Sequence, residues 1–175
     1  MTANGRLSQY GAQALANHIS GNAPVYIGSS APTWVPGLSW VNTTSGAVRY
    51  EWNSSAWVLA STMGQYIALL TADPTTGPAI NVSDLTEVTT AGYSRSAVTF
   101  TAASSAYPAV VSNNGTLTWG PLSADMLLAA EWAALVTCAS GTLGIFKYSW
   151  PIAPQQKATS QVMQLATGGL TLSES

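Results

Sequence analysis

Charged residues are the class that this sequence has least of. Only 7% of the 175 residues are charged, and the formal net charge is −2. The five Lys and Arg residues are scattered and form no basic stripe that could neutralise phosphates, so we expect no nucleic-acid partner. Solubility must therefore depend on uncharged polar side chains, which is unusual for a free cytosolic enzyme.

Cysteine and histidine are scarcer still. Each occurs once, at Cys138 and His18. A single cysteine excludes an internal disulfide framework, so packing or partner chains must hold the fold together. Neither residue has a second His, Cys or carboxylate at ligand spacing, and the two are far apart in the chain. We therefore expect no metal site, no cofactor and no catalytic cysteine.

Long apolar runs are also missing. No stretch approaches the roughly 18 apolar residues of a membrane span, and the first residues lack the basic and then apolar order of a signal peptide. We expect a soluble chain that is not secreted and has no membrane partner.

Residues 1–23 predict a short amphipathic helix and an arm. Asn4 can cap the helix, and Gly21 and Pro24 can end it. The apolar residues near helical spacing are Leu7, Tyr10, Ala14, Leu15 and Ile19.

Residues 24–64 predict a small β-meander rich in tryptophan. Three extended runs, Leu38 to Asn42, Ala47 to Trp52 and Ala56 to Leu59, are joined by Thr-Thr-Ser-Gly and Asn-Ser-Ser, which are good hairpin connectors. Alternation in the second run places its aromatic residues on one face and Arg49 and Glu51 on the other, so the aromatic face must be covered.

The aromatic residues of this segment allow two interpretations. Large side chains are needed to give so small a module any core; alternatively, aromatic planes can stack on sugars. The core interpretation is favoured because no cluster of Asp, Asn and Glu lies nearby to bind hydroxyl groups. The candidate glycan or interface contacts are Trp34, Trp40, Tyr50, Trp52, Trp57 and, further along the chain, Arg95.

Residues 65–175 are strand-like almost throughout and predict a mainly β fold, an antiparallel, jelly-roll-like β-sandwich. The run YIALLTA from Tyr66 suits a central strand and is followed by a DPTTGP turn. Pro151 and Pro154 should end a later strand or place it at a sheet edge. Further strands are expected within SAVTFTAA, YPAVVSNNGTLTWG, LGIFKYSWPI and GGLTLSES.

The segment from Leu122 to Cys138 is ambiguous. Its start has a Ser123 cap and strong helix formers, whereas Trp132, Ala134 and Val136 alternate as in a strand. We expect a helical turn near Ser123 to Leu127, followed by a strand.

Three motifs punctuate the last two thirds of the chain: Thr-Ala-Asp-Pro at Thr71 to Pro74, Gly-Tyr-Ser-Arg at Gly92 to Arg95, and Gly-Leu-Thr-Leu at Gly169 to Leu172. Together with the front helix, they resemble tail-fibre-like virion proteins of phages that infect actinobacteria and their relatives. Where those proteins tend to carry an Asp at the start of the late hairpin turn, this chain has Cys138 or Ala139. Residues 37–59 are similar to small tryptophan hairpin modules of phage fibre proteins.

The resemblance implies a non-enzymatic structural protein of the bacteriophage virion exterior, either a fibre or spike subunit or a capsid decoration protein. Such a protein would act as a homo-oligomer, by analogy a trimer, and would dock on other virion proteins such as major capsid or tail proteins. The alternative is a receptor-binding module that holds a host cell-surface glycan.

A cell-wall hydrolase is the third hypothesis. A glycosidase needs two carboxylates at a fixed separation, and the chain offers Asp73, Asp84, Glu87, Asp125 and Glu131. Asp73 precedes a proline and more simply shapes a turn. Arg95 could pair with Glu87 or Asp84, or meet an acidic group across an interface.

Overall fold

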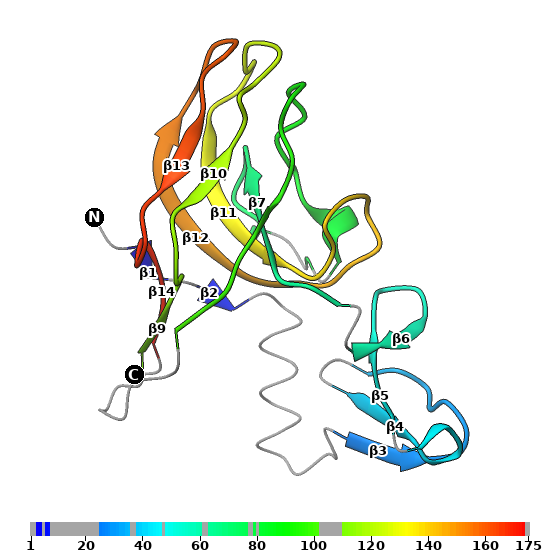
Figure 1. The fold of residues 1–175 in the computed structure, drawn as a ribbon. Helices are drawn as coiled ribbons and strands as arrows, with labels where there is room; N and C mark the ends of the chain where they lie inside the picture. Colours follow the sequence, from blue (N-terminus) through cyan, green and yellow to red (C-terminus); the bar gives the residue numbers. More distant parts are fainter. Residues whose placement is uncertain are drawn as a thin grey trace.

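The fold is mainly β, as expected, and its sheets are largely antiparallel (Figure 1). The computed structural model describes residues 3–4, 6–7, 25–35, 38–46, 48–60, 63–76, 79, 81–101 and 110–173. No helix among these residues is long and apolar enough to span a membrane. The strands are β1 (Ala3–Asn4), β2 (Arg6–Leu7), β3 (Val25–Gly28), β4 (Ser39–Asn42), β5 (Val48–Trp52), β6 (Trp57–Leu59), β7 (Tyr66–Leu70), β8 (Ser96–Ala97), β9 (Val110–Ser112), β10 (Leu117–Trp119), β11 (Ala130–Val136), β12 (Phe146–Gln155), β13 (Met163–Leu165) and β14 (Leu170–Ser173), and two short 3-10 helices are η1 (Thr43–Ser45) and η3 (Val82–Asp84).

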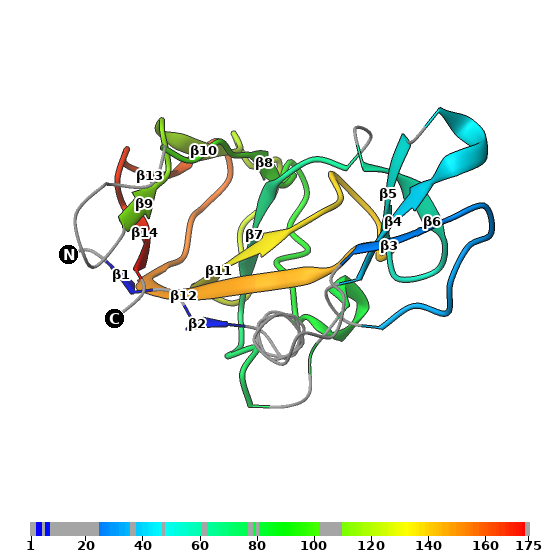
Figure 2. The ribbon, with the colours of Figure 1, turned by 90° about the horizontal axis from the view of Figure 1, so that it is seen from below.

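The strands form four sheets. The largest has five strands in the order β2-β12-β11-β7-β8, all antiparallel to their neighbours. Two smaller sheets, β1-β14-β9 and β10-β13, share a hydrophobic core with it. The fourth sheet, β3-β4-β5-β6, lies to one side of the others in both views (Figures 1 and 2). We call residues 25–60 the aromatic sheet, and the described residues of 63–173 with β1 and β2 the body.

Most of the helix and arm expected over residues 1–23 lies outside the described residues, which include only 3–4 and 6–7 of that segment. The part that is described differs from the prediction, because Leu7 belongs to β2 and pairs with Tyr148 of β12. Asn4, expected as a helix cap, lies in β1 and pairs with Thr171 of β14. Pairing with the body therefore overrides the helical spacing at this end of the predicted segment.

The central strands of the body are buried on both faces. Along β7, Ile67 and Leu69 join a core with Trp150, whereas Ala68 and Leu70 join a second core on the opposite face. That second core is covered by the segment after Thr76, which contributes Ala79, Val82 and Leu85. A strand buried on both faces reads as a continuous apolar run rather than as an alternation, which explains the sequence YIALL.

Of the two outcomes expected for the prolines of the strand after Gly144, a strand end or an edge position, the structure shows the edge position. β12 does not end at Pro151 but continues through Pro154 to Gln155. Its pairing with β2 involves only Tyr148 and Ser149, so beyond Ser149 no described strand pairs with its outer side. Proline lacks an N–H group and is tolerated on such an edge. The pairing of this part of β12 with β11 has a register shift between Ala130 and Trp132.

Two expectations about the later part of the body, a helical turn and a strand, need correction. The helical turn near Ser123 to Leu127 is absent from this described stretch, which consists of bends and irregular backbone. The strand expected after it is β11. Local helix propensity is overridden because the Met126 N–H donates to the Lys157 carbonyl instead of to a preceding turn. The strand β13 was not anticipated. Within residues 96–101, the described part of the strand expected in SAVTFTAA, the structure has β8 and a single bridge at Phe100. The jelly-roll-like sandwich itself stays a prediction.

Candidate functional site

The strands of the aromatic sheet confirm the three runs expected from the sequence. β4, β5 and β6 are joined as antiparallel neighbours, and each lies within one residue or two of its predicted bounds. The Asn42 side chain accepts a hydrogen bond from the Thr44 N–H and starts η1, and Gly46 ends η1 with φ +73°, which a glycine adopts without strain. β3, which pairs in parallel with β4, was not predicted.

The aromatic rings of this sheet pack mainly against one another. Trp40 is buried, with its ring centroid 4.8 Å from that of Tyr50 and 6.1 Å from that of Trp57. Trp52 meets Trp57 edge-on at 5.7 Å and stacks on Trp34 at 5.7 Å. Such spacings are those of favourable aromatic pairs, so the rings form the core of the sheet.

The indole N–H groups hold the segment before β4 against the sheet. Trp40 Nε1 donates to the Gly28 carbonyl at 3.0 Å, and Trp57 Nε1 donates to the Pro32 carbonyl at 3.1 Å. On the other face of β5, Arg49 forms an exposed ion pair with Glu51 at 2.9 Å. Glycan binding by these tryptophans stays a prediction from the sequence.

A second group of interacting residues, which lies in the body, centres on Arg95. Its guanidinium makes a two-pronged ion pair with Glu87, through Nε to Oε1 at 2.9 Å and Nη2 to Oε2 at 2.6 Å. The same guanidinium donates to the carbonyls of Cys138 at 3.0 Å and Gly141 at 2.8 Å. Of the partners that the sequence suggested for Arg95, the structure shows the ion pair with Glu87. The Arg95 side chain is only 5% exposed. Arg95 therefore clamps the turn between β11 and β12.

The Tyr93 hydroxyl completes this cluster. It donates to Glu87 Oε1 at 2.8 Å and accepts the Leu69 N–H at 2.8 Å. Burial, with the negative charge of Glu87 beside it, raises the pKa of the Tyr93 phenol far above its ordinary value. Burial would lower the pKa of Arg95, but the hydrogen bond and charge of Glu87 outweigh it and raise that pKa. Both groups therefore hold their protons throughout the physiological range.

Cys138 lies at the edge of the Arg95 cluster. Burial raises the pKa of its thiol, although the Arg95 charge opposes the shift. A protonated thiol is a poor nucleophile. Beside the cluster is a cavity of about 300 Å³, lined mainly by the segment 87–95 and by residues 139–141 of the turn.

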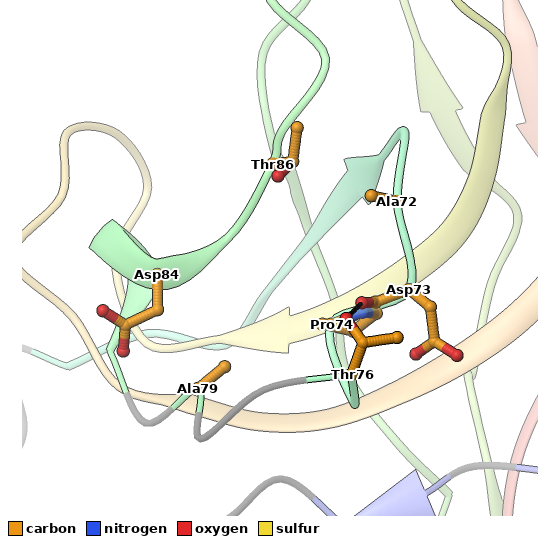
Figure 3. A pocket seen from close by; sticks show the side chains of 7 residues that line it. All are labelled: Ala72, Asp73, Pro74, Thr76, Ala79, Asp84 and Thr86. Atoms are coloured by element: carbon orange, nitrogen blue, oxygen red, sulfur yellow. Dashed lines mark hydrogen bonds between the residues drawn. The ribbon is translucent and has the colours of Figure 1, made fainter.

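Two of the candidate carboxylates, Asp73 and Asp84, line another cavity of about 300 Å³ (Figure 3). Their carboxylate groups point in different directions in this view. Asp73 Oδ1 accepts the Thr75 N–H and hydroxyl at 2.8 and 2.6 Å, which is the turn-shaping role expected for it. Asp84 Oδ2 accepts the Asn81 N–H at 2.8 Å and starts η3. Each carboxylate thus stabilises its own turn.

The two remaining candidate carboxylates are Asp125, in the loop before β11, and Glu131, in β11. Asp125 Oδ1 accepts the N–H and hydroxyl of Thr159, both at 2.7 Å, and these bonds lower the pKa of Asp125. Glu131 is exposed on β11. Among the residues that the structure describes, no three His, Cys, Asp or Glu side chains lie close enough together to hold a metal ion.

The loop before β11 presents apolar side chains to solvent. Leu127 is 92% and Leu128 64% exposed. The loop is nevertheless fixed, because the Met126 N–H donates to the Lys157 carbonyl at 2.9 Å and Gln156 Nε2 donates to the Met126 carbonyl at 2.9 Å. Leu127 and Leu128 are adjacent in sequence and together give this loop a small exposed apolar area.

Comparison with known proteins gives one family. Residues 50–173 match the family model described as podophage GP4 fiber I protein gp80. The chain belongs to this family. It is thus a bacteriophage fibre protein and a structural part of the virion. No curated protein and no solved structure matches the chain.

The sequence alone did not single out two polar residues that organise the fibre protein. Asn113 is fully buried; its amide donates to the Gly115 and Ala166 carbonyls, and its Oδ1 accepts the Leu170 N–H. Tyr93 was seen only as part of a turn motif. In both cases the fold brings the hydrogen-bond partners close together. The one local signal, the Asn-Asn-Gly sequence at Asn113, predicts a turn but not the hydrogen bonds from Asn113 to Ala166 and Leu170.

Proposed function

We propose that this fibre protein works by contact alone, as a homo-oligomer that docks on other virion proteins. The observation that carries the proposal is the match of residues 50–173 to a phage fibre family. The few charges of the chain offer little repulsion between copies. We further propose a trimer, and that residues 24–64 and 65–175 are two modules of a fibre of the actinobacteriophage type.

The contact between copies is proposed to include Leu127 and Leu128. Burying both side chains would contribute roughly 2 kcal/mol each, by the usual value for a leucine removed from water. Because the loop backbone is already held by Lys157 and Gln156, little ordering entropy opposes the contact.

The assembly can be tested by analytical ultracentrifugation of the purified chain. We expect an oligomer that is weakened at least about tenfold by L127S/L128S, as expected from loss of apolar burial. Leu143→Ser is the matched control, because Leu143 is 59% exposed at the other end of the β11–β12 hairpin. A monomeric wild-type chain at micromolar concentration, or equal effects of the two variants, contradicts the proposed contact.

The place in the virion needs a separate measurement. Quantitative mass spectrometry of purified particles gives the copy number, and immunogold labelling gives the position. A fibre predicts a few copies at the tail, whereas many copies spread over the head indicate a decoration protein. Release of reducing ends from host cell walls by the purified chain would contradict a role by contact alone.

A further inference from the structure

The turn between β11 and β12, residues 138–144, joins three segments that are distant in the chain. Arg95 holds its Cys138 and Gly141 carbonyls, and the Gly144 carbonyl accepts the Val82 N–H at 3.0 Å. The Gly144 N–H donates to Ser54 Oγ of the aromatic sheet at 3.1 Å. Both ribbon views show this turn beside the aromatic sheet (Figures 1 and 2).

The backbone of Ser54 is in an unfavourable conformation for its residue type. Ser54 has φ +83°, in the left-handed region where a side chain is rarely accepted. It lies in the tight turn between β5 and β6, closed by the Asn53 N–H donating to the Ala56 carbonyl at 3.0 Å. Glycine occupies such a position without strain. The presence of serine therefore needs an explanation from outside the turn.

The Gly144 N–H supplies that explanation. Gly144 is buried, and a buried amide without an acceptor is costly. The turn is also tight around it, since a Cβ at Gly144 would lie 2.5 Å from Cys138 Sγ. A glycine at position 54 would relax the β5–β6 turn but would leave this amide without the serine hydroxyl.

The two regions are otherwise separate in their strand pairing and in their hydrophobic cores. No described strand of the aromatic sheet pairs with a described strand of the body, and neither hydrophobic core of the body contains a residue from the aromatic sheet. A polar contact at the β5–β6 turn can therefore decide how the two regions are oriented.

We propose that Ser54 is a latch: its hydroxyl, held in a strained turn, fixes the direction in which the aromatic sheet projects from the body. When the Ser54–Gly144 hydrogen bond opens, the aromatic sheet keeps its own fold but reorients relative to the body. The latch does not depend on the fibre assignment, because both of its parts lie within one chain.

The test compares Ser54→Gly with Ser55→Ala, a matched control in the same turn. The Ser55 N–H and hydroxyl both donate to Asn53 Oδ1, within the same turn. Neither of these hydrogen bonds reaches the body. In Ser54→Gly, hydrogen exchange at the Gly144 amide should accelerate about tenfold, as the loss of one ordinary hydrogen bond implies. Small-angle scattering should show a broader distribution of shapes, while the amides of β4, β5 and β6 keep their protection. Ser54→Asn, which tolerates positive φ and retains an acceptor, should restore both properties in part.

Two results would overturn the latch. Unchanged Gly144 exchange in Ser54→Gly would show that the hydrogen bond is not made in solution. Faster exchange with an unchanged scattering curve would show that Ser54 only satisfies the Gly144 amide and does not orient the aromatic sheet.

Discussion

The aromatic sheet and the body bury apolar surface with different side chains. The body has enough strands to enclose Ile67, Leu69 and Trp150 almost completely, mostly with aliphatic neighbours. The aromatic sheet buries Trp40, and its other rings remain partly exposed while they pack on one another. Small units have a high ratio of surface to volume, so they need large side chains to make a core at all.

This difference indicates where each region is vulnerable. In the body, many side chains share the burial, and the backbone is tied by polar contacts such as those of Asn113 and Arg95. In the aromatic sheet, a few ring contacts carry most of the packing. We therefore expect the aromatic sheet to open at a lower free energy than the central strands of the body.

The largest effect is expected from Trp150→Ala in the body. Trp150 is fully buried, donates from Nε1 to the Thr171 carbonyl at 2.7 Å, and stacks between Phe100 and Tyr148. The cavity and the loss of the indole hydrogen bond should lower the free energy of unfolding by about 4 kcal/mol. Urea denaturation followed by circular dichroism measures this. Glu131→Ala, at an exposed position, should change it by less than about 0.5 kcal/mol, and similar values for both variants would contradict the assignment of this core.

The next effect should be confined to one region. Trp40→Ala removes the central ring of the aromatic sheet and should destabilise that sheet by about 3 kcal/mol. Hydrogen exchange should accelerate in peptides from β4 to β6 and stay unchanged in β7 and β11. Val25→Ala, at an exposed site of β3, is the control. Equal loss of protection in both regions would show that the two fold as one unit.

The two ion pairs provide a matched comparison of a buried and an exposed charge. Arg95→Met leaves the largely buried Glu87 carboxylate without its charged partner, with only the Tyr93 hydroxyl donating to it among the bonds described above, and should cost about 2–3 kcal/mol. Arg49→Met breaks an exposed pair and should cost less than about 1 kcal/mol. Loss of the Arg95 clamp should also accelerate hydrogen exchange at the backbone amides of the 138–144 turn, because two of its carbonyls lose their donor. Unchanged exchange in this turn would show that Arg95 does not hold it.

Prediction from the sequence succeeded where local pattern and tertiary structure agree. The runs of β4, β5 and β6 lie between connectors whose geometry is set locally, such as the Asn42-capped η1. The central β7 was found because burial on both faces demands a continuous apolar run. The ring packing of Trp40 follows from the same need to cover an aromatic face.

Prediction failed where distant segments decide the outcome. Helix formers near Ser123 gave no helix, because the Met126 backbone bonds to Lys157 instead. The sequence left open whether Pro151 ends its strand or lies on an edge; the edge position is observed, since no described strand needs an N–H on that side of β12. The sequence left three possible partners for Arg95: Glu87, Asp84 or an acidic group across an interface. The choice of Glu87 and the contacts with Cys138 and Gly141 depend on how β11 and β12 are placed.

The smallest effect is expected at the loop that presents Leu127 and Leu128. The hydrogen bonds from Thr159 lower the pKa of Asp125, so the ionised form is favoured in the folded chain. The contribution of Asp125 to the stability of the folded chain is thus fully present above the ordinary aspartate pKa of about 3.9. It is lost as the pH falls through the lower pKa that Asp125 has in the folded chain.

An NMR titration of the Thr159 amide measures this pH dependence directly. We expect its resonance to shift with a midpoint below about 3.9, and the shift to vanish in Asp125→Asn, which keeps an acceptor but does not titrate. Because Asp125 is exposed, the unfolding midpoint of the body should hardly change between the two chains. A titration midpoint at or above the ordinary value would mean that Thr159 does not hold Asp125 in solution, and that the apolar loop is less rigid than the contacts of Met126 and Gln156 imply.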